Sequence, residues 1–221
     1  MTTSKQQTLV ERYALGPEAI EERSFSLIES MLPDLTWTDA ERHVVIRVVH
    51  SAGDPSLAPL IRFTPGAVDA GIAALRGGCD IFTDVTMVGA GLYKPWLQTL
   101  GCDVSCSIAD PEVAAKAKEW GTTRAVAAMR HTGSKLSSSI VAIGNAPTSL
   151  LSLLDQVDEG LPPPALTIGV PVGFIASSES KAELMKRPNV ESISLPGYRG
   201  GSPMAAAILN ALLYLATQEH R

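Results

Sequence analysis

Hydrophobic positions near the start of the chain recur at helical spacing. Pro17 suits the first position of a helix, apolar residues follow at intervals of three or four, and Pro33 prevents continuation. We therefore predict a helix between these two prolines. The polar segment before it has no periodicity, and we expect residues 1–15 to form a loose tail.

The apolar run between His43 and His50 has two interpretations. Thr38 and Glu41 have the spacing of a capping box, which predicts a helix starting just before the run. Four valines and an isoleucine are typical of a strand instead, but the paired spacing of the valines favours a helix. On a helix, His43, Arg47 and His50 share one face, whereas on a strand Arg47 and His50 face opposite sides.

From residue 64 onward, short apolar runs alternate with helical patterns. Each run ends in a loop rich in glycine or proline, and this order is typical of parallel strands joined by helices. We predict one α/β domain over residues 16–221, with three α/β/α layers and a mostly parallel sheet. The expected strands are 79–83, 102–107, 139–143, 166–168 and 190–193, and helices are expected from Thr64-Pro65, Asp110-Pro111, Thr122 or Thr123, and Ser202.

Composition and charge exclude several classes of protein. Hydrophobic residues are 45% of the 221 and charged residues 19%, which excludes a disordered chain. The 18 basic and 23 acidic residues give a net charge of −5, which argues against a nucleic-acid partner. No run approaches the roughly 18 apolar residues that span a bilayer, and the first residues lack an apolar signal region. Together with three cysteines, too few for a closed disulfide set, these features indicate a cytoplasmic protein without a membrane partner.

Three strand-to-helix junctions are similar in composition, namely residues 144–148, 169–174 and 196–202. If the strands are parallel, these loops share the carboxyl edge of the sheet, where open α/β sheets bind ligands. Their glycines permit close approach, the following helix N-termini attract anions, and Arg199 adds a positive charge. The alternative is that glycine and proline only make tight turns here.

Signatures of cofactor binding are incomplete. Gly89 and Gly91 begin like a dinucleotide fingerprint, but Lys94 stands where the third glycine is needed. Cys102 and Cys106 share a face of a predicted strand without further zinc ligands nearby. There is also no serine-hydrolase elbow. We expect neither a metal nor a cofactor.

The four histidines differ in their expected surroundings. We expect His131 and His220 to be solvated, and His43, near a helix start, to be exposed as well. His50 ends the apolar run at a helix-to-loop exit, a place from which an imidazole can exchange a proton at the mouth of a cleft. The alternative is a helix-end histidine that interacts with the helix dipole.

Taken together, these motifs resemble those of the precorrin-8X methylmutase family, which includes the cobalt-precorrin-8 methylmutases. The resemblance covers nearly the whole chain in one order, and its most specific parts are residues 141–148 and 171–174. The other matching segments are Arg23-Ser24-Phe25, Arg47 to His50 with Gly53, Asp84 with Met87-Val88, residues 121–124, Glu179-Ser180-Lys181 and residues 197–202.

The resemblance implies an isomerase that moves a methyl group between adjacent ring C carbons of precorrin-8X or cobalt-precorrin-8, giving hydrogenobyrinate or cobyrinate. Such a shift needs no redox cofactor. His50 aligns with the family's catalytic histidine and would protonate the macrocycle or stabilise its protonated tautomer. The family also implies a homodimer with sites near the subunit interface. By motif position, the substrate-binding candidates are Ser24, Arg47, Arg124, Asn145, Thr148, Arg199, Gly200, Gly201 and Ser202.

Two departures from the family pattern concern the cleft. Ser51-Ala52-Gly53 follows His50 where the family often has Ala-Cys-Gly, and residues 83–86 replace a more usual Cys-Asp-Ala segment. Both leave His50 in place. Two other functions stay open at this point: a tetrapyrrole carrier that binds without turnover, and a nucleotide-dependent oxidoreductase that uses the glycine-rich edge.

Overall fold

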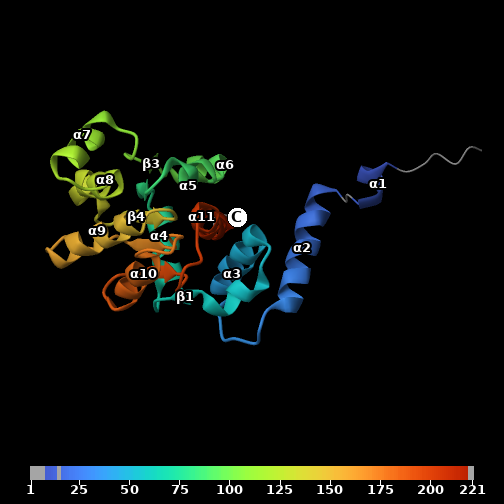
Figure 1. Cartoon of the computed structure of the whole chain (residues 1–221). Coiled ribbons are helices and arrows are strands. Elements are labelled where there is room, and N and C mark those ends of the chain that lie inside the picture. The colour runs from blue at the N-terminus through green and yellow to red at the C-terminus, as the bar shows by residue number, and fades with distance from the viewer. Residues whose placement is uncertain (1–7, 14–15, 219–221) are drawn as a thin grey trace, which may run out of the picture.

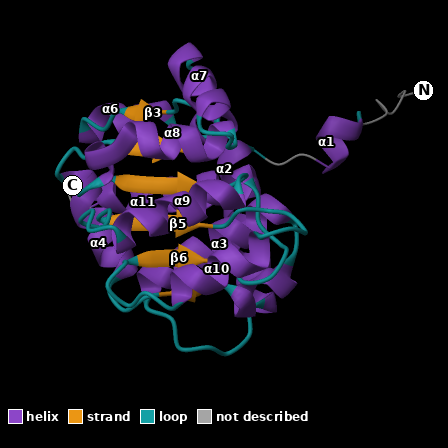
Figure 2. Cartoon of the chain, turned by 60° about the vertical axis from the view of Figure 1, so that its left-hand side comes forward, coloured by secondary structure: helices purple, strands orange, loops and turns teal. Residues whose placement is uncertain are grey.

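A six-stranded sheet forms the middle layer of the protein (Figures 1 and 2). The computed structural model describes residues 8–13 and 16–218. Strand order is β1-β6-β5-β4-β2-β3, and all neighbours are parallel except β1, which runs antiparallel to β6. The predicted three-layer, mostly parallel α/β fold is therefore confirmed. The strands are β1 (Arg62–Phe63), β2 (Ile81–Thr83), β3 (Val104–Ser105), β4 (Ile140–Ile143), β5 (Leu166–Gly169) and β6 (Ser192–Ser194).

Helices cover both faces of the sheet (Figure 1). One layer contains α3 (Asp39–Ala52), α4 (Ala67–Arg76), α5 (Thr86–Ala90), α6 (Lys94–Leu100) and α11 (Ser202–Gln218), and the other contains α7 (Pro111–Glu119), α8 (Arg124–Thr132), α9 (Pro147–Asp158) and α10 (Ser177–Met185). Outside these layers, α2 (Pro17–Met31) packs on α3, and the remaining elements are α1 (Leu9–Tyr13), η1 (Pro55–Leu60) and η2 (Gly133–Leu136).

Strand β4 divides the two hydrophobic cores. Ile140 and Ala142 pack with α3, α4 and α11, whereas Val141 and Ile143 pack with α8, α9 and α10. All four side chains are completely buried, because successive residues of a strand point to opposite faces and both faces are covered. This explains why the strand is apolar at every position.

The run from His43 to His50 is helical, which decides between its two interpretations. Thr38 Oγ1 accepts from the backbone N–H of Glu41 at 3.2 Å, and the Glu41 carboxylate accepts from the Thr38 N–H at 2.8 Å, so the capping box is complete. The helix ends at Gly53, whose φ of +63° is the left-handed conformation that glycine adopts readily. The four valines of the run are buried against α11 and the sheet.

Several element boundaries differ from the prediction. Strand β3 is only two residues long, so Cys102 and Cys106 lie outside it, and the prediction that they share a strand face is wrong. Strand β6 begins two residues later than expected, and α4 begins at Ala67, after Gly66 at a φ of +89°. The two-residue β1 and the short α5 and α6 were not predicted, since segments this short show no periodicity.

The N-terminal segment is described only in part. Residues 1–7 and 14–15 of the expected tail lie outside the described residues, and Leu9–Tyr13 form α1. No helix of the described part of the chain is long and apolar enough to cross a membrane.

Candidate active site

The three glycine-rich turns follow β4, β5 and β6, at the same edge of the sheet, as parallel strands require. Two of them are joined through their backbones. The Gly173 N–H donates to the Tyr198 carbonyl at 3.2 Å, and the Gly201 N–H donates to the Val170 carbonyl at 2.9 Å. A Cβ on Gly200 would lie 2.2 Å from the Val170 oxygen, so this contact requires glycine. The turns are thus more than chain reversals, because they form one packed edge.

The turn after β4 is held by a buried carboxylate. Asp84 follows β2, is only 2% exposed, and accepts backbone N–H groups from Gly144, Asn145 and Ala146 at 3.0, 2.8 and 2.6 Å. Burial raises the pKa of Asp84, while the three N–H donors act in the opposite direction. Asp84 entered the sequence analysis only as part of a matching motif, and its binding to the turn after β4 was not predicted. A single acidic residue directly after a predicted strand was the signal of its role.

His50 lines a cavity of about 420 Å³ between α2 and α3. His50 is exposed, and its ring forms a T-shaped contact with the ring of Phe25 at a centroid distance of 5.3 Å and an interplanar angle of 85°. The volume is within the range of small-molecule sites. The other lining residues are Ser24, Leu27, Ile28 and Met31 of α2, and Val49, Gly53 and Pro55 at the end of α3 and beyond.

Arg47 lies one turn before His50 but already has partners. Its Nη1 is 2.7 Å from Glu21 Oε1, and its guanidinium lies 4.7 Å from the centroid of the Phe25 ring. Nε of Arg47 is buried and has no hydrogen-bond partner in the described part of the chain. Any carboxylate of a ligand would therefore compete with Glu21 for this guanidinium.

Arg199 connects the turn after β6 with the end of the His50 helix. Its Nη1 donates to Ser56 Oγ at 2.9 Å and lies 3.5 Å from Asp54 Oδ2. Both partners follow α3 within a few residues of His50. Neighbouring Gly200 and Gly201 contact the β5 turn, as described above. Ser202, which begins α11, packs so closely on the end of β4 that a Cβ on Gly144 would lie 2.7 Å from its Cα.

The remaining candidates lie around the turn after β4. Asn145 is exposed, and Thr148 Oγ1 lies 3.3 Å from Thr123 Oγ1, which caps α8. Arg124, the first residue of α8, is exposed and forms no ion pair with the described residues. Within residues 8–13 and 16–218, no hydrogen bond joins Arg124, Asn145 or Thr148 to a residue that lines the His50 pocket.

Two of the other histidines are less exposed than predicted. His43 is half-buried and stacks on Tyr214 at 5.0 Å, and burial, followed by the nearby Arg47 charge, lowers its pKa. His131 is half-buried with Nδ1 only 3.0 Å from Lys116 Nζ. Both predictions failed because neighbours distant in sequence cover the rings. His220 lies outside the described residues. No group of three potential metal-ligating side chains occurs among the described residues.

Comparison with known proteins supports the family resemblance that the sequence motifs indicate. A family model described as precorrin-8X methylmutase matches residues 19–215. The chain belongs to the precorrin-8X methylmutase family. As a member of this family it is an isomerase. The enzyme class predicted from the motifs is therefore confirmed, and the alternative of an oxidoreductase is excluded.

Relatives in this family match over most of their length. A cobalt-precorrin-8 methylmutase of Priestia megaterium is 40% identical over 200 residues, which are 90% of this chain and 88% of the relative. A precorrin-8X methylmutase of Pseudomonas aeruginosa is 40% identical over 203 residues, 90% of this chain and 96% of the relative. The crystal structure of the precorrin-8X methylmutase from Thermus thermophilus superposes with a TM-score of 0.84 at 37% identity, covering 91% of this chain and 98% of that one.

Proposed function

We propose that this chain moves a methyl group between adjacent ring C carbons of precorrin-8X or cobalt-precorrin-8, with His50 as the acid–base group. One observation carries the proposal: His50 lines an open cavity at the end of α3, and Arg199 ties a glycine-rich turn to the same helix end. Family membership gives the reaction class. The geometry supports the residue that handles the proton.

The chemistry asked of the protein is modest. An intramolecular methyl shift changes no oxidation state, so a proton that His50 lends to the macrocycle returns to it at the end. Imidazole is suited to both steps near neutral pH. The edge contact with Phe25 restricts the ring of His50, and the enzyme otherwise accelerates the reaction by holding a rigid substrate in place.

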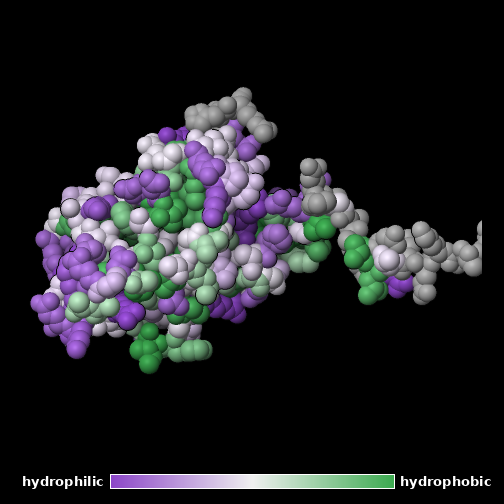
Figure 3. Space-filling model, turned by 90° about the horizontal axis from the view of Figure 1, so that it is seen from above, coloured by the Kyte–Doolittle hydropathy of each residue, from purple (hydrophilic) through white to green (hydrophobic). Residues whose placement is uncertain are grey.

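The carboxyl edge offers both apolar and cationic contacts to such a substrate. Phe174 and Tyr198 lie on the two joined turns with ring centroids 5.6 Å apart, and both are exposed. They could pack on the flat face of a tetrapyrrole, while Arg124 and Arg199 could bind its acidic side arms. Hydrophobic patches interrupt the hydrophilic surface in Figure 3. A local cationic contact is needed because the chain as a whole carries a net charge of −5.

We further propose a cytoplasmic homodimer whose sites lie near the subunit interface. The His50 cavity has walls from α2, α3 and the residues just after α3, and it is otherwise open. A second subunit on α2 would supply further walls and bring more cationic groups to the substrate.

The test is conversion of purified precorrin-8X or cobalt-precorrin-8 by the purified protein, followed by the absorption change of the ring. Product of unchanged mass, formed without added nicotinamide, supports the methylmutase. Binding of the pigment without conversion of either substrate would instead establish the carrier. Mass analysis of any pigment that co-purifies shows whether the natural ligand contains cobalt.

A further inference from the structure

Lys181 joins the two turns of the candidate site from inside the protein. It lies in the middle of α10 and is completely buried. Its ammonium donates to the Pro171 carbonyl at 3.0 Å and to the Arg199 carbonyl at 2.8 Å. These two carbonyls belong to different turns, one after β5 and the other after β6. No carboxylate among the described residues forms an ion pair with Lys181.

A lone buried ammonium is costly, and an aliphatic side chain would fill the same space at less cost. Burial lowers the pKa of Lys181 to about 8, which shows the penalty on its charged form. The carbonyl oxygens of Pro171 and Arg199 point inward at this place, and a buried acceptor without a donor is costly as well. Lys181 therefore stabilises a particular backbone arrangement of the two turns.

That arrangement controls three features of the site. The backbone of Arg199 is held by Lys181, while its side chain reaches Asp54 and Ser56 beside the His50 helix. Phe174 and Tyr198 project outward from the two joined turns. If the turns separated, the aromatic pair would spread and the Arg199 guanidinium would lose its position.

We infer that Lys181 is a positioning residue, which sets the spacing of the turns after β5 and β6 and thereby the contacts of Phe174, Tyr198 and Arg199 with substrate. The inference rests on the proposed function insofar as these turns bind the substrate. The spacing itself can be measured without substrate.

The experiment compares Lys181→Met with Lys186→Met. Methionine is unbranched and nearly as long as lysine, and it removes the donor. Lys186 lies just after α10, is exposed and, among the residues that the structure describes, pairs only with Glu183, so its variant controls for loss of a lysine in the same region. Amide hydrogen exchange is measured at equal intervals below the Tm of each protein. In Lys181→Met we expect exchange in residues 171–175 and 196–201 to rise roughly tenfold while α11 exchanges as in the parent.

Kinetics give the second readout. We expect Lys181→Met to raise KM roughly tenfold with little change in kcat, because the substrate contacts move and the histidine does not. Lys186→Met should match the parent in both measurements. Faster exchange spread evenly over the protein, or unchanged exchange in both turns, overturns the inference. If the parent converts no substrate, the proposed function fails, whereas the exchange result still decides the role of Lys181.

A variant that does not fold leaves the question to Lys181→Arg. Arginine retains a charged donor that can reach both carbonyls. A folded Lys181→Arg protein with parental exchange in the two turns supports the inference. If Lys181→Arg also fails to fold, or if it folds with rapid amide exchange in both turns, the result counts against a requirement for a buried cationic donor.

Discussion

At the scale of single residues, His50 and His131 make a matched pair for testing the proton chemistry. His50 lines the cavity and contacts Phe25, whereas His131 pairs with Lys116 on the opposite helical layer. We expect His50→Ala to lower kcat at least about 100-fold, the usual contribution of a general acid or base. Affinity for the pigment should change little, because the cavity walls remain.

The measurement is conversion rate together with a pigment titration of each variant. His131→Ala should convert substrate at the parental rate. Turnover of the His50→Ala protein at a normal rate, with normal pigment binding, would remove this histidine from the mechanism.

Sequence reasoning located the candidates but not their partners. The position of His50 at a helix exit followed from an apolar run and the glycine after it, both local features. Glu21 forms an ion pair with Arg47, and Asp84 binds the turn after β4. Both contacts depend on the packing of segments far apart in the chain, which the sequence does not show. Lys181 entered the sequence analysis only as part of a matching motif. Its burial was not predicted, because a helical pattern does not show that a lysine points inward.

At the scale of elements, Gly200 tests whether the contact between two turns matters. Its φ of +156° disfavours other residues, and an added Cβ would meet the backbone oxygens of Val170 and Pro171 at 2.2 and 2.8 Å. Because backbone atoms give way less easily than side chains, Gly200→Ala should lower the free energy of unfolding by about 2 kcal/mol. It should also raise KM, since the turn that carries Tyr198 and Arg199 must shift.

Gly160→Ala is the control, because Gly160 has a φ of +105° but, apart from its chain neighbours, no heavy atom of the described residues lies within 4 Å of its added Cβ. Urea denaturation and steady-state kinetics of both variants separate backbone strain from displacement of the turn. Equal KM values for the two variants would contradict a role for the contact between the turns.

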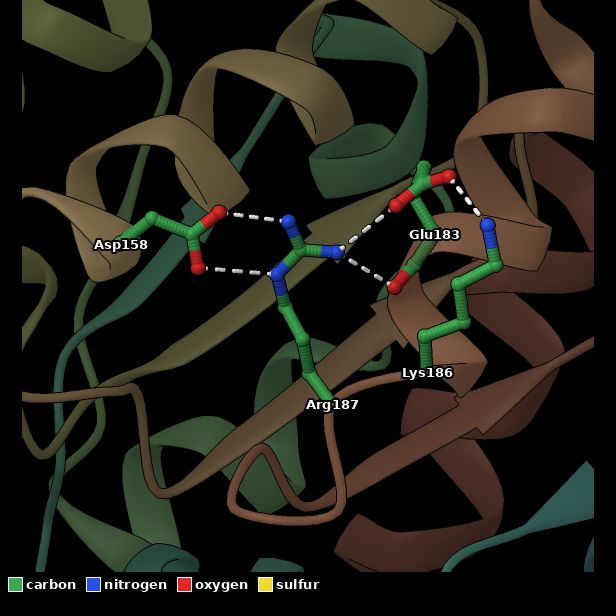
Figure 4. A network of polar contacts seen from close by, with 4 residues as sticks. All are labelled: Asp158, Glu183, Lys186 and Arg187. Atoms are coloured by element: carbon green, nitrogen blue, oxygen red, sulfur yellow. Dashed lines mark hydrogen bonds and ion pairs between the residues drawn. The ribbon is translucent and has the colours of Figure 1, made fainter.

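The network around Arg187 links α9 to α10 and predicts a pH dependence (Figure 4). Arg187 lowers the pKa of Asp158, while Lys186 first and Arg187 second lower that of Glu183. A carboxylate with a lowered pKa stabilises the folded state above its ordinary pKa, and this contribution is lost as the pH falls through the folded value. Isolated surface pairs contribute little, but here one guanidinium binds two carboxylates, one of them through two nitrogens.

We therefore expect Arg187→Gln to lower Tm most clearly near neutral pH. The difference in Tm from the parent should narrow as the pH falls below the ordinary pKa of these carboxylates and through their lowered folded values, where the paired carboxylates take up protons. Thermal unfolding followed by circular dichroism over this range gives the answer. Lys135→Gln, whose lysine has no ion pair among the described residues, should show no such narrowing. If the difference in Tm between Arg187→Gln and the parent grows in acid, the ion pairs of Arg187 with Asp158 and Glu183 do not account for that difference.

The elements show which local signals survive folding. The capping box, the prolines that bound α2 and the apolar β4 each act over a few residues, and each prediction was confirmed. Strand β1 exists only because β6 lies beside it, with Arg62 opposite Ser194. Pairing across about 130 residues leaves no periodic trace in a two-residue strand.

At the scale of the whole molecule, helix α2 carries apolar side chains that face away from the core as well as ones that pack on it. Ile28 and Leu32 at its end pack toward the core, but Ile20, Leu27 and Met31 are 45%, 58% and 51% exposed. Their spacing of seven and four residues places them on one side of the helix. Exposed apolar side chains grouped on one side of an outer helix are typical of an interaction surface. Because this helix also forms a wall of the His50 cavity, a second subunit bound here would lie beside the candidate site.

We therefore expect a dimer in light scattering and a loss of dimer in Ile20→Asp, whose position does not line the His50 cavity. The introduced carboxylate would be buried in an apolar contact, so the dissociation constant of the dimer should rise at least roughly tenfold. Ser26→Asp adds one charge on another side of the same exposed helix and should remain a dimer. If the site needs both subunits, conversion by Ile20→Asp should fall and recover at protein concentrations that restore the dimer. A monomeric parent with full activity would contradict both the interface and its part in the site.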